Sequence, residues 1–283
     1  MTIEKALVVG TGLIGTSAAL ALRGKGVTVY LSDVDADAVR LAGELGAGRE
    51  WAGEEADLAL IAVPPHLVGE RLAELQKRGA ARVYTDVASV KADPIADAER
   101  LGCDLTSYVP GHPLAGRERS GPAAARADLF SGRPWALCPR PRTDAKALAV
   151  TRDLVAMCGA KAVTVDAGEH DSAVALVSHA PHLVASAMAA SLADGDDVAL
   201  GLAGQGLRDV TRIAAGNPLL WRMILAGNAL PVAGVLERVA ADLAAAASAL
   251  RSGDLDDVTD LLRRGVDGQA RIPGKHGGPE GDA

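Results

Sequence analysis

Three glycines near the amino terminus have the spacing of a phosphate-binding turn. Gly10, Gly12 and Gly15 form the pattern GxGxxG in the segment VVGTGLIGTS, directly after the apolar residues 6–9. Glycines at these positions permit a tight turn, a close approach of the backbone to a pyrophosphate, and close packing of the following helix, whose amino terminus faces the phosphates. The chemistry predicted for this segment is the binding of a dinucleotide.

Asp33 makes that prediction more specific. It stands 23 residues after Gly10, where the second strand pattern ends, and a carboxylate there accepts hydrogen bonds from the ribose hydroxyls and repels a 2′-phosphate. NAD is therefore preferred over NADP, although Arg40, about one helical turn further on, could help to bind a phosphate. The alternative is a glycine turn beside an unrelated surface aspartate. Four apolar residues at the edges of the turn are expected to complete the cofactor site: Leu13, Ile14, Val63 and Pro64.

A second segment, VPGHPLAGRERSG, holds a lone histidine between a glycine and a proline. This residue, His112, is followed by the charged Arg117, Glu118 and Arg119, although the flanking segments are apolar. A histidine changes its charge near neutral pH and can therefore take part in proton transfer. Considered by itself, His112 could equally be a turn residue without a role, and the charges after it a solvated cluster.

The elements that would position these residues alternate between strand and helix. Strand patterns occupy residues 6–9, 27–31, 57–63, 82–85, 105–109, 134–138 and 162–165, and helical patterns lie between them at residues 13–24, 35–45, 66–78, 94–101 and 144–158. This alternation predicts an α/β fold, with a mainly parallel sheet covered on both faces. Residues 1–167 are accordingly expected to form a Rossmann-type dinucleotide-binding domain.

The strand signal disappears after Asp166. From Glu169 to about Arg264 the sequence is rich in alanine and leucine at helical spacing, which predicts an all-α second domain over residues 168–272. Its apolar content exceeds what one thin bundle would bury, so we expect a homodimer interface there. Residues 273–283 are glycine-rich and polar, and are expected to be disordered.

Composition narrows the class of protein. The chain of 283 residues has a net charge of −7 and no long basic run, which argues against binding to nucleic acid. Cys103, Cys138 and Cys158 show no CxxC spacing, so neither a disulfide framework nor a zinc knuckle is predicted. A strand pattern begins within five residues of the amino terminus, which leaves no room for a signal peptide and predicts a cytoplasmic protein.

One stretch, residues 172–190, is nearly apolar and about long enough to span a bilayer. It contains His179, Pro181 and His182, and no basic residues flank it. We therefore interpret it as a helix that is buried on most sides, and expect no membrane partner.

Five segments taken in order resemble the prephenate/arogenate dehydrogenase family of tyrosine biosynthesis. They are GTGLIGTS (residues 10–17), TDVASVK (85–91), GHPLAGRERSG (111–121), HDSAVALVSHAPHL (170–183) and LRDVTRIAAGNPLLW (207–221). The resemblance extends over almost the whole chain. It implies a dinucleotide-binding domain followed by a helical dimerisation domain, and an enzyme that converts prephenate to 4-hydroxyphenylpyruvate by NAD-dependent oxidative decarboxylation.

The resemblance also implies roles for residues around the nicotinamide. His112 would accept the proton of the substrate hydroxyl, from the carboxyl edge of the sheet. Ser89 would hydrogen-bond that hydroxyl and orient the histidine and the nicotinamide, or would alternatively cap the helix that follows it. Glu118 matches the acidic residue near the mouth of the family's site. Many relatives have a small polar residue where Arg117 stands, which leaves the contacts of the substrate side chain open.

A second group of residues would bind the two carboxylates of the substrate. Arg208 and Arg212 stand at i and i+4 on one predicted helix face, and the resemblance assigns a carboxylate to Arg212 and a second basic position to Arg208. Both could instead be surface charges, paired with Asp209 or with other residues. His179 and His182 would line the pocket. A metal site is the alternative, but no third ligand stands nearby in the sequence, which argues against it. Trp221 would close the pocket or fill the core.

Three alternatives to prephenate dehydrogenation stay open at this point. The substrate could be arogenate, or a 4-amino-4-deoxy analogue of prephenate in a specialised pathway. From a different class, the chain could be a sensor that binds NAD without turnover, although such a sensor needs neither His112 nor Arg212.

Overall fold

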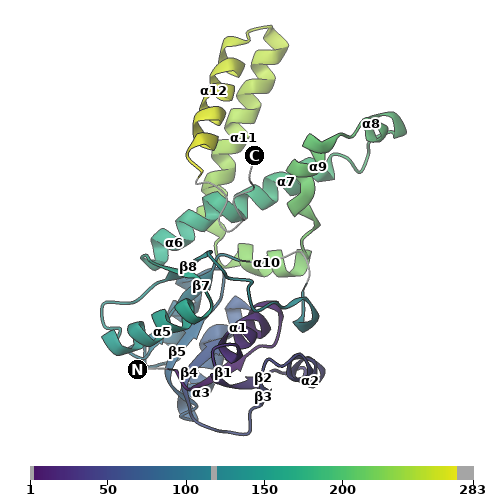
Figure 1. Cartoon of the computed structure of the whole chain (residues 1–283). Helices are drawn as coiled ribbons and strands as arrows, with labels where there is room; N and C mark the ends of the chain where they lie inside the picture. Colours follow the sequence, from purple (N-terminus) through teal and green to yellow (C-terminus); the bar gives the residue numbers. More distant parts are fainter. Residues whose placement is uncertain (1–2, 116–119, 273–283) are drawn as a thin grey trace, which may run out of the picture. The chain divides into compact units, whose positions relative to one another are not determined.

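The computed structural model describes residues 3–115 and 120–272 and contains a six-stranded parallel sheet (Figure 1). Its strands are β1 Lys5–Val9, β2 Thr28–Ser32, β3 Arg49–Glu50, β4 Ala56–Ile61, β5 Ala81–Asp86 and β6 Tyr108–Val109. Their order is β3-β2-β1-β4-β5-β6, so the direction of winding reverses between β1 and β4. Ligands of such sheets bind at the carboxyl ends of the strands beside this reversal. The predicted α/β Rossmann-type fold is confirmed.

Both faces of this sheet are buried under helices. The helices in this part of the chain are α1 Leu13–Arg23, α2 Ala36–Glu44, α3 Val68–Lys77, α4 Ala92–Arg100 and α5 Ala145–Met157. Side chains alternate between the two faces along a strand, so Val8 of β1 lies in the core cluster under α1 and α5, and Leu7 lies in the cluster under α3 and α4. This two-sided burial explains why the strands are continuous apolar runs.

Two strands of the six-stranded sheet differ from the prediction. The strand expected at residues 105–109 contains only Tyr108 and Val109, because the Asp104 carboxylate accepts hydrogen bonds from the backbone N–H and the hydroxyl of Thr106, at 2.9 and 2.6 Å, and turns the chain there. The two-residue strand β3 was not predicted, since it carries no apolar pattern.

A second, three-stranded sheet begins at the predicted proton acceptor. It consists of β7 Gly111–Pro113, β8 Pro134–Leu137 and β9 Lys161–Thr164, with β7 antiparallel to β8 and β8 parallel to β9. His112 therefore lies within a strand of this second sheet rather than at the end of a strand of the main one. Only glycine fits at position 111, because a Cβ there would lie 2.9 Å from the backbone oxygen of Asp86.

The three cysteines are free thiols. Burial raises the pKa of both Cys138 and Cys158 to about 12, so these two remain protonated and are poor nucleophiles near neutral pH. Their role is to fill the core as small apolar side chains.

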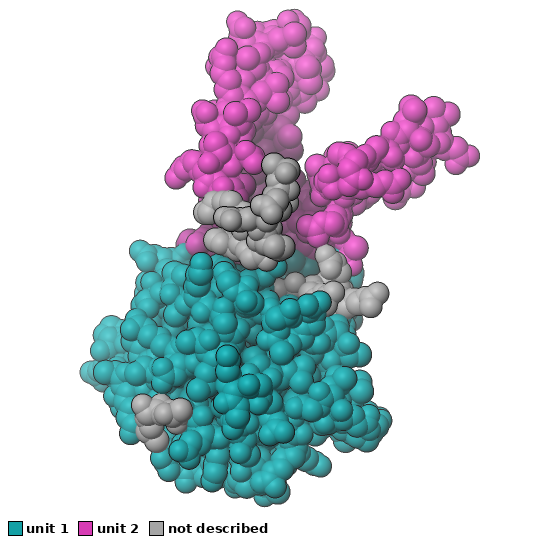
Figure 2. All heavy atoms as spheres, in the orientation of Figure 1, with its two compact units in different colours: residues 1–171, 216–227 teal, residues 172–215, 228–283 magenta. Residues whose placement is uncertain are grey.

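The described residues form two compact units (Figure 2). The first comprises the residues up to Asp171 together with Gly216–Gly227, and the second comprises Ser172–Ala215 together with the residues from Asn228 onward. The helical elements after β9 are α6 Ala167–Val174, the π-helical turn η3 Ala175–His179, α7 Ala180–Ala190, α8 Asp197–Gly201, α9 Gln205–Thr211, the 3₁₀ turn η4 Arg212–Ala215, α10 Pro218–Ala226, α11 Ala229–Ser252 and α12 Asp256–Ala270. Of these, α10 belongs to the first unit. Residues 273–283, predicted to be disordered, lie outside the described residues.

The helix made of α6, η3 and α7 is long and apolar enough to cross a membrane by length and composition, as some core helices also are. Only one of its faces is buried in the single chain: Ala175 and Ala180 are buried, whereas Leu176 and Val177 are 57% and 68% exposed. The expectation that this helix is buried on most sides is therefore wrong for the isolated chain.

Candidate active site

The glycine turn joins β1 to α1 at the carboxyl edge of the main sheet. Gly10 has a φ of 102°, and a Cβ there would lie 2.2 Å from the carbonyl oxygen of Ala62. A Cβ at Gly15 would lie 1.9 Å from the carbonyl oxygen of Gly10, so both positions require glycine. At Gly12, by contrast, no described atom lies within 4 Å of a Cβ, and no side chain caps the first turn of α1. The turn thus offers open space and backbone N–H donors to a pyrophosphate.

Asp33 is bonded to this turn. Its Oδ2 accepts hydrogen bonds from the backbone N–H and the hydroxyl of Thr11, at 2.6 and 3.0 Å. Its Oδ1 accepts one from the backbone N–H of Asp35 at 3.1 Å, and a carboxylate oxygen can accept a further bond. Asp33 therefore orients the glycine turn and keeps capacity to accept a ribose hydroxyl, which fits the dinucleotide predicted for this site.

The other predicted cofactor residues lie along the same edge. Leu13 and Ile14 are half-buried in the first turn of α1, and Val63 and Pro64 are half-buried just beyond β4, the strand that pairs with β1. Arg40, the residue that could favour NADP, donates instead to Asp37 and Glu44 of its own helix at 3.1 and 2.8 Å. Its charge is therefore already matched by two carboxylates.

The ring of the half-buried His112 contacts a second histidine. His112 Nδ1 lies 2.9 Å from Nε2 of His170 on α6, and the two rings meet edge to face. His170 Nδ1 in turn lies 2.8 Å from Asp171 Oδ1. Sequence reasoning assigned no role to His170 or Asp171. The available signal was the pair HD at the head of an apolar stretch, where a buried acid and histidine require partners.

Asp171 also caps a helix. Its Oδ1 accepts the backbone N–H of Lys91 and its Oδ2 that of Ala92, each at 2.8 Å, at the amino terminus of α4. Lys91, not Ser89, stands at the cap position, so the alternative that Ser89 is the helix cap is wrong. The half-buried Ser89 lies in the loop between β5 and α4 and makes no hydrogen bond to another described residue.

A fully buried ion pair supports the backbone of His112. The Lys91 ammonium contacts the Asp86 carboxylate and donates to the carbonyl oxygen of Gly111 at 2.5 Å. Asp86 also accepts the Tyr108 hydroxyl at 2.6 Å and the Gly111 N–H at 3.2 Å. Burial and the nearby Asp86 carboxylate raise the pKa of Tyr108 well above its usual value, so that Tyr108 stays a donor. Sequence reasoning quoted the TDVASVK segment but missed this cluster.

The predicted carboxylate-binding residues lie in the second unit. Arg208 is exposed on α9, and the α-helix ends at Thr211, so that Arg212, also exposed, opens the 3₁₀ turn η4 rather than continuing the predicted helix face. No described carboxylate pairs with Arg208. Asp209, its suggested partner, accepts a hydrogen bond from Gln205 instead.

His179 and His182 are buried in the second unit, at 2% and 5% exposure. His179 is the last residue of the π-helical turn and its Nδ1 lies 3.0 Å from the amide nitrogen of Asn228. Burial lowers the pKa of His182, so this ring is neutral at pH 7 and can hydrogen-bond but not pair as a cation. Within the described chain, no three histidine, cysteine or acidic side chains gather in a metal-binding cluster.

Trp221 and Glu118 are the last two residues predicted to contact the substrate. Trp221 is half-buried on α10, in the first unit, and so is not a full core residue. Glu118, with Arg117 and Arg119, lies outside the described residues.

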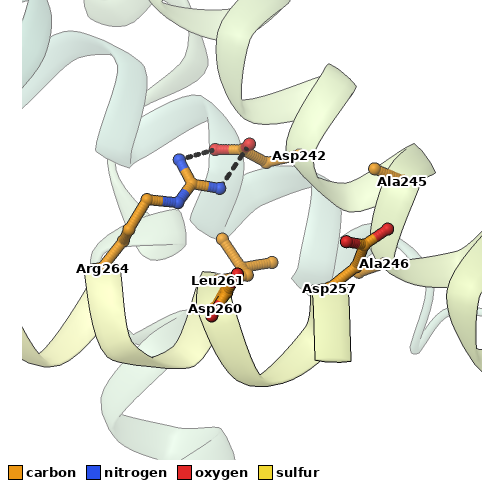
Figure 3. A pocket seen from close by; sticks show the side chains of 7 residues that line it. All are labelled: Asp242, Ala245, Ala246, Asp257, Asp260, Leu261 and Arg264. Carbon is orange, nitrogen blue, oxygen red and sulfur yellow. Dashed lines mark hydrogen bonds and ion pairs between the residues drawn. The ribbon is translucent and has the colours of Figure 1, made fainter. Parts of the chain in front are cut away.

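A pocket of about 260 Å³ lies elsewhere, between α11 and α12 (Figure 3). Arg264 donates across it to both carboxylate oxygens of Asp242, at 2.8 and 3.4 Å. None of the predicted site residues lines this pocket, so the pocket is not assigned to the predicted chemistry.

Two family models match the chain. Residues 18–164 match the nucleotide-binding domain of prephenate dehydrogenase, and residues 166–264 match its dimerization domain. The first match begins inside α1, after the glycine turn. Together the two models account for most of the chain.

Individual proteins agree with these models. The protein named probable prephenate dehydrogenase NovF, from Streptomyces niveus, is 45% identical over 97% of this chain and 79% of its own length. The crystal structure of A. aeolicus prephenate dehydrogenase, in complex with hydroxyphenyl propionate and NAD+, matches with a TM-score of 0.87 and 25% identity, over 96% of this chain and 99% of that one.

Synechocystis arogenate dehydrogenase is also similar, with a TM-score of 0.79 and 28% identity over 95% of this chain and 100% of that one. The family models and the relatives thus agree with each other and with a glycine turn built for a dinucleotide, and the chain belongs to the prephenate dehydrogenase family.

Proposed function

We propose that this protein catalyses the NAD-dependent oxidative decarboxylation of prephenate to 4-hydroxyphenylpyruvate in tyrosine biosynthesis. The observation that carries the proposal is the His112 ring, oriented by His170 in the same unit as the glycine turn. Further support comes from the A. aeolicus relative, which binds NAD+ and hydroxyphenyl propionate, a compound that shares a hydroxyphenyl group with the proposed product.

The chain's own residues have few tasks, because aromatisation of the ring drives the loss of carbon dioxide. His112 accepts the proton of the ring hydroxyl, which requires a neutral imidazole. Ser89 donates a hydrogen bond to the same hydroxyl oxygen and orients it toward His112. Gly10, Gly12, Gly15 and Asp33 would hold NAD, which would supply the acceptor for the hydride of the carbon that bears the hydroxyl.

The two substrate carboxylates need basic partners, and guanidinium groups bind carboxylates through two parallel hydrogen bonds. We assign one carboxylate to Arg212 and a supporting charge to Arg208. His179 and His182 line the pocket, His182 as a neutral hydrogen-bonding group. Glu118 stands near the mouth of the site and Trp221 closes it. That His112 and Arg212 act on one substrate stays a prediction.

Loss of Arg212 is expected to weaken substrate binding. Arg212→Ala should raise KM for prephenate about 30-fold or more, which corresponds to roughly 2 kcal/mol, because a carboxylate loses its bidentate partner. Arg212→Lys keeps the positive charge but not the planar guanidinium group, so its KM should lie between those of the wild type and Arg212→Ala. Steady-state kinetics measures KM for each variant. An unchanged KM in Arg212→Ala would remove this residue from substrate binding.

NAD is expected to be the better cofactor. Because Asp33 places a carboxylate beside the ribose site and Arg40 is matched by Asp37 and Glu44, kcat/KM for NAD should exceed that for NADP by roughly tenfold or more. A side-by-side assay of the two cofactors measures this ratio. Equal or better use of NADP would contradict the assignment of Asp33.

We further propose a homodimer through the helical unit. Leu243 and Leu250 of α11 and Leu262 of α12 are 59%, 60% and 65% exposed in the single chain, and the family model of this region is a dimerization domain. Sedimentation velocity should give twice the mass of one chain, and a monomer at micromolar concentration would contradict the proposal.

Because the cysteines are free thiols, a cytoplasmic location is proposed, which cell fractionation tests.

One assay tests the proposed reaction. Purified protein is mixed with NAD and, separately, with prephenate, arogenate or the 4-amino-4-deoxy analogue of prephenate, and NADH is followed by absorbance. NADH formation with prephenate is the expected result. Formation with arogenate alone would make this an arogenate dehydrogenase, which the similarity to the Synechocystis enzyme favours as the second candidate. NAD binding without turnover of any of the three would indicate a sensor.

A further inference from the structure

The His112 ring ends a series of contacts that begins at a buried carboxylate. Asp171 Oδ1 lies 2.8 Å from His170 Nδ1, and His170 Nε2 lies 2.9 Å from His112 Nδ1. His170 and Asp171 are only 2% and 3% exposed. In the reaction proposed above, neither of them binds the substrate or takes up a proton.

The direction of these hydrogen bonds follows from what Asp171 already accepts. Its two oxygens receive the backbone N–H groups of Lys91 and Ala92, which can only donate. An ionised carboxylate has no hydrogen to give, so the hydrogen in its contact with His170 must be on His170 Nδ1. A neutral His170 then has its lone pair on Nε2, and accepts a hydrogen from His112 Nδ1.

We infer that His170 and Asp171 are positioning residues that hold His112 in the tautomer with its hydrogen on Nδ1 and its lone pair on Nε2. The hydrogen bond made by one imidazole nitrogen decides which form the other takes. The inference deepens the proposed function and rests on it, since it identifies Nε2 as the atom that receives the proton of the substrate hydroxyl.

The proton of the substrate hydroxyl is transferred to His112 and moves no further along the series of contacts. The O–H bond of the substrate breaks and an N–H bond forms at Nε2, while the Nδ1–H bond of His112 stays intact. The hydrogen bond from Nδ1 to His170 then becomes charge-assisted, and the Asp171 carboxylate, connected through His170, offsets part of the new positive charge.

The same carboxylate connects the ring of His112 to its backbone. Lys91, whose backbone N–H donates to Asp171, holds the Gly111 carbonyl through its ammonium group. The contacts therefore close into a circuit that runs from His112 through His170, Asp171 and Lys91 to the peptide preceding His112. This circuit fixes both the ring and the main chain of the proton acceptor.

Kinetics of three variants tests the inference. His170→Leu removes the acceptor and should lower kcat roughly 10- to 100-fold, with KM little changed, because part of the contribution of the base is lost. His170→Gln keeps an acceptor oxygen and should recover most of that loss. Asp171→Asn should lower kcat by a similar factor as His170→Leu and move the acid limb of the kcat/KM profile to lower pH, since a nearby anion favours the protonated base.

The matched control is Asp144→Asn, which removes a capping carboxylate from α5; the Asp144 side chain accepts from the backbone N–H of Lys146 and bonds to no described member of the circuit. It should leave kcat and the acid limb unchanged. Other titratable groups near the circuit stay the same in every variant: Asp86, Lys91, Asp93, Tyr108, Cys138 and Asp166. Unchanged kcat in His170→Leu, or an unmoved acid limb in Asp171→Asn, would overturn the inference while leaving the proposed function intact.

A spectroscopic measurement separates the inference from the reaction. In protein labelled with ¹⁵N-histidine, His112 should show a protonated Nδ1 and an unprotonated Nε2 above the acid limb, and its signals among those of the six histidines are identified by their absence in His112→Asn. The opposite tautomer would overturn the inference whatever the activity. The expected tautomer in a protein that turns over no substrate would instead refute the proposed function alone.

Discussion

Replacing His112 by asparagine is expected to lower kcat with prephenate by about 10²- to 10⁴-fold, the usual contribution of a general base. Asparagine has a similar polarity and fits the half-buried position in β7, but its amide cannot take up a proton near neutral pH. The affinity for NAD should change little, because the glycine turn and Asp33 follow β1 and β2 of the main sheet, whereas His112 lies in β7 of the second sheet. Steady-state kinetics and a titration with NAD measure the two effects.

The control for this variant is Leu114→Asn, two residues further along the same segment, at a side chain that is 37% exposed. It should keep kcat within about twofold of the wild type, since exposed substitutions usually have small effects. Near-normal turnover by His112→Asn would remove this residue from the mechanism. A loss of NAD affinity as large as the loss of kcat would instead indicate damage to the fold.

Replacing Lys91 by methionine is expected to lower the free energy of unfolding of the first unit by about 3–5 kcal/mol. The Lys91 and Asp86 side chains are both 0% exposed and paired. Removing one partner of a buried pair leaves the other charge without compensation in a low-dielectric interior. The Gly111 carbonyl also loses its donor, so we expect kcat to fall as well.

Denaturant unfolding followed by tryptophan fluorescence measures this effect in the correct unit, because Trp51, Trp135 and Trp221 all belong to the first one. The matched control is Arg100→Met on α4, where the ion pair with Asp97 is exposed, at 68% and 36% for the two side chains. It should cost at most about 1 kcal/mol. Equal losses in the two variants would contradict a special role for the buried pair.

The fold could be predicted from the sequence because its signals are local. The continuous apolar runs of β1, β2 and β4 require burial on both faces, and the helices between them show helical periodicity. Local signals failed where a polar side chain determines the backbone conformation: the Asp104 side chain turns the chain at Thr106, so the strand expected at residues 105–109 begins only at Tyr108. They also failed for β7, since its pairing partner β8 lies more than twenty residues away along the chain.

The candidate site was predictable in part. The glycine turn and Asp33 follow from spacing, since a turn between a strand and a helix needs only neighbouring residues. The partners of His112 do not follow from spacing, because His170 is 58 residues away in sequence, and Asp171 caps a helix at Lys91, 80 residues before it. The sequence around His112 and the sequence around His170 contain no pattern that predicts contact between the two side chains.

The sequence by itself determined the α/β class, the dinucleotide turn, the helical second part of the chain and the family, since each depends on the order and periodicity of neighbouring residues. Only the tertiary structure decided that His112 contacts His170, which in turn contacts Asp171. It also decided that Lys91, Asp86 and Tyr108 form a buried cluster, which hydrogen-bonds the backbone of Gly111. The physical reason is that a parallel sheet brings the ends of distant segments to one edge. Hydrogen bonds form between whichever side chains meet there.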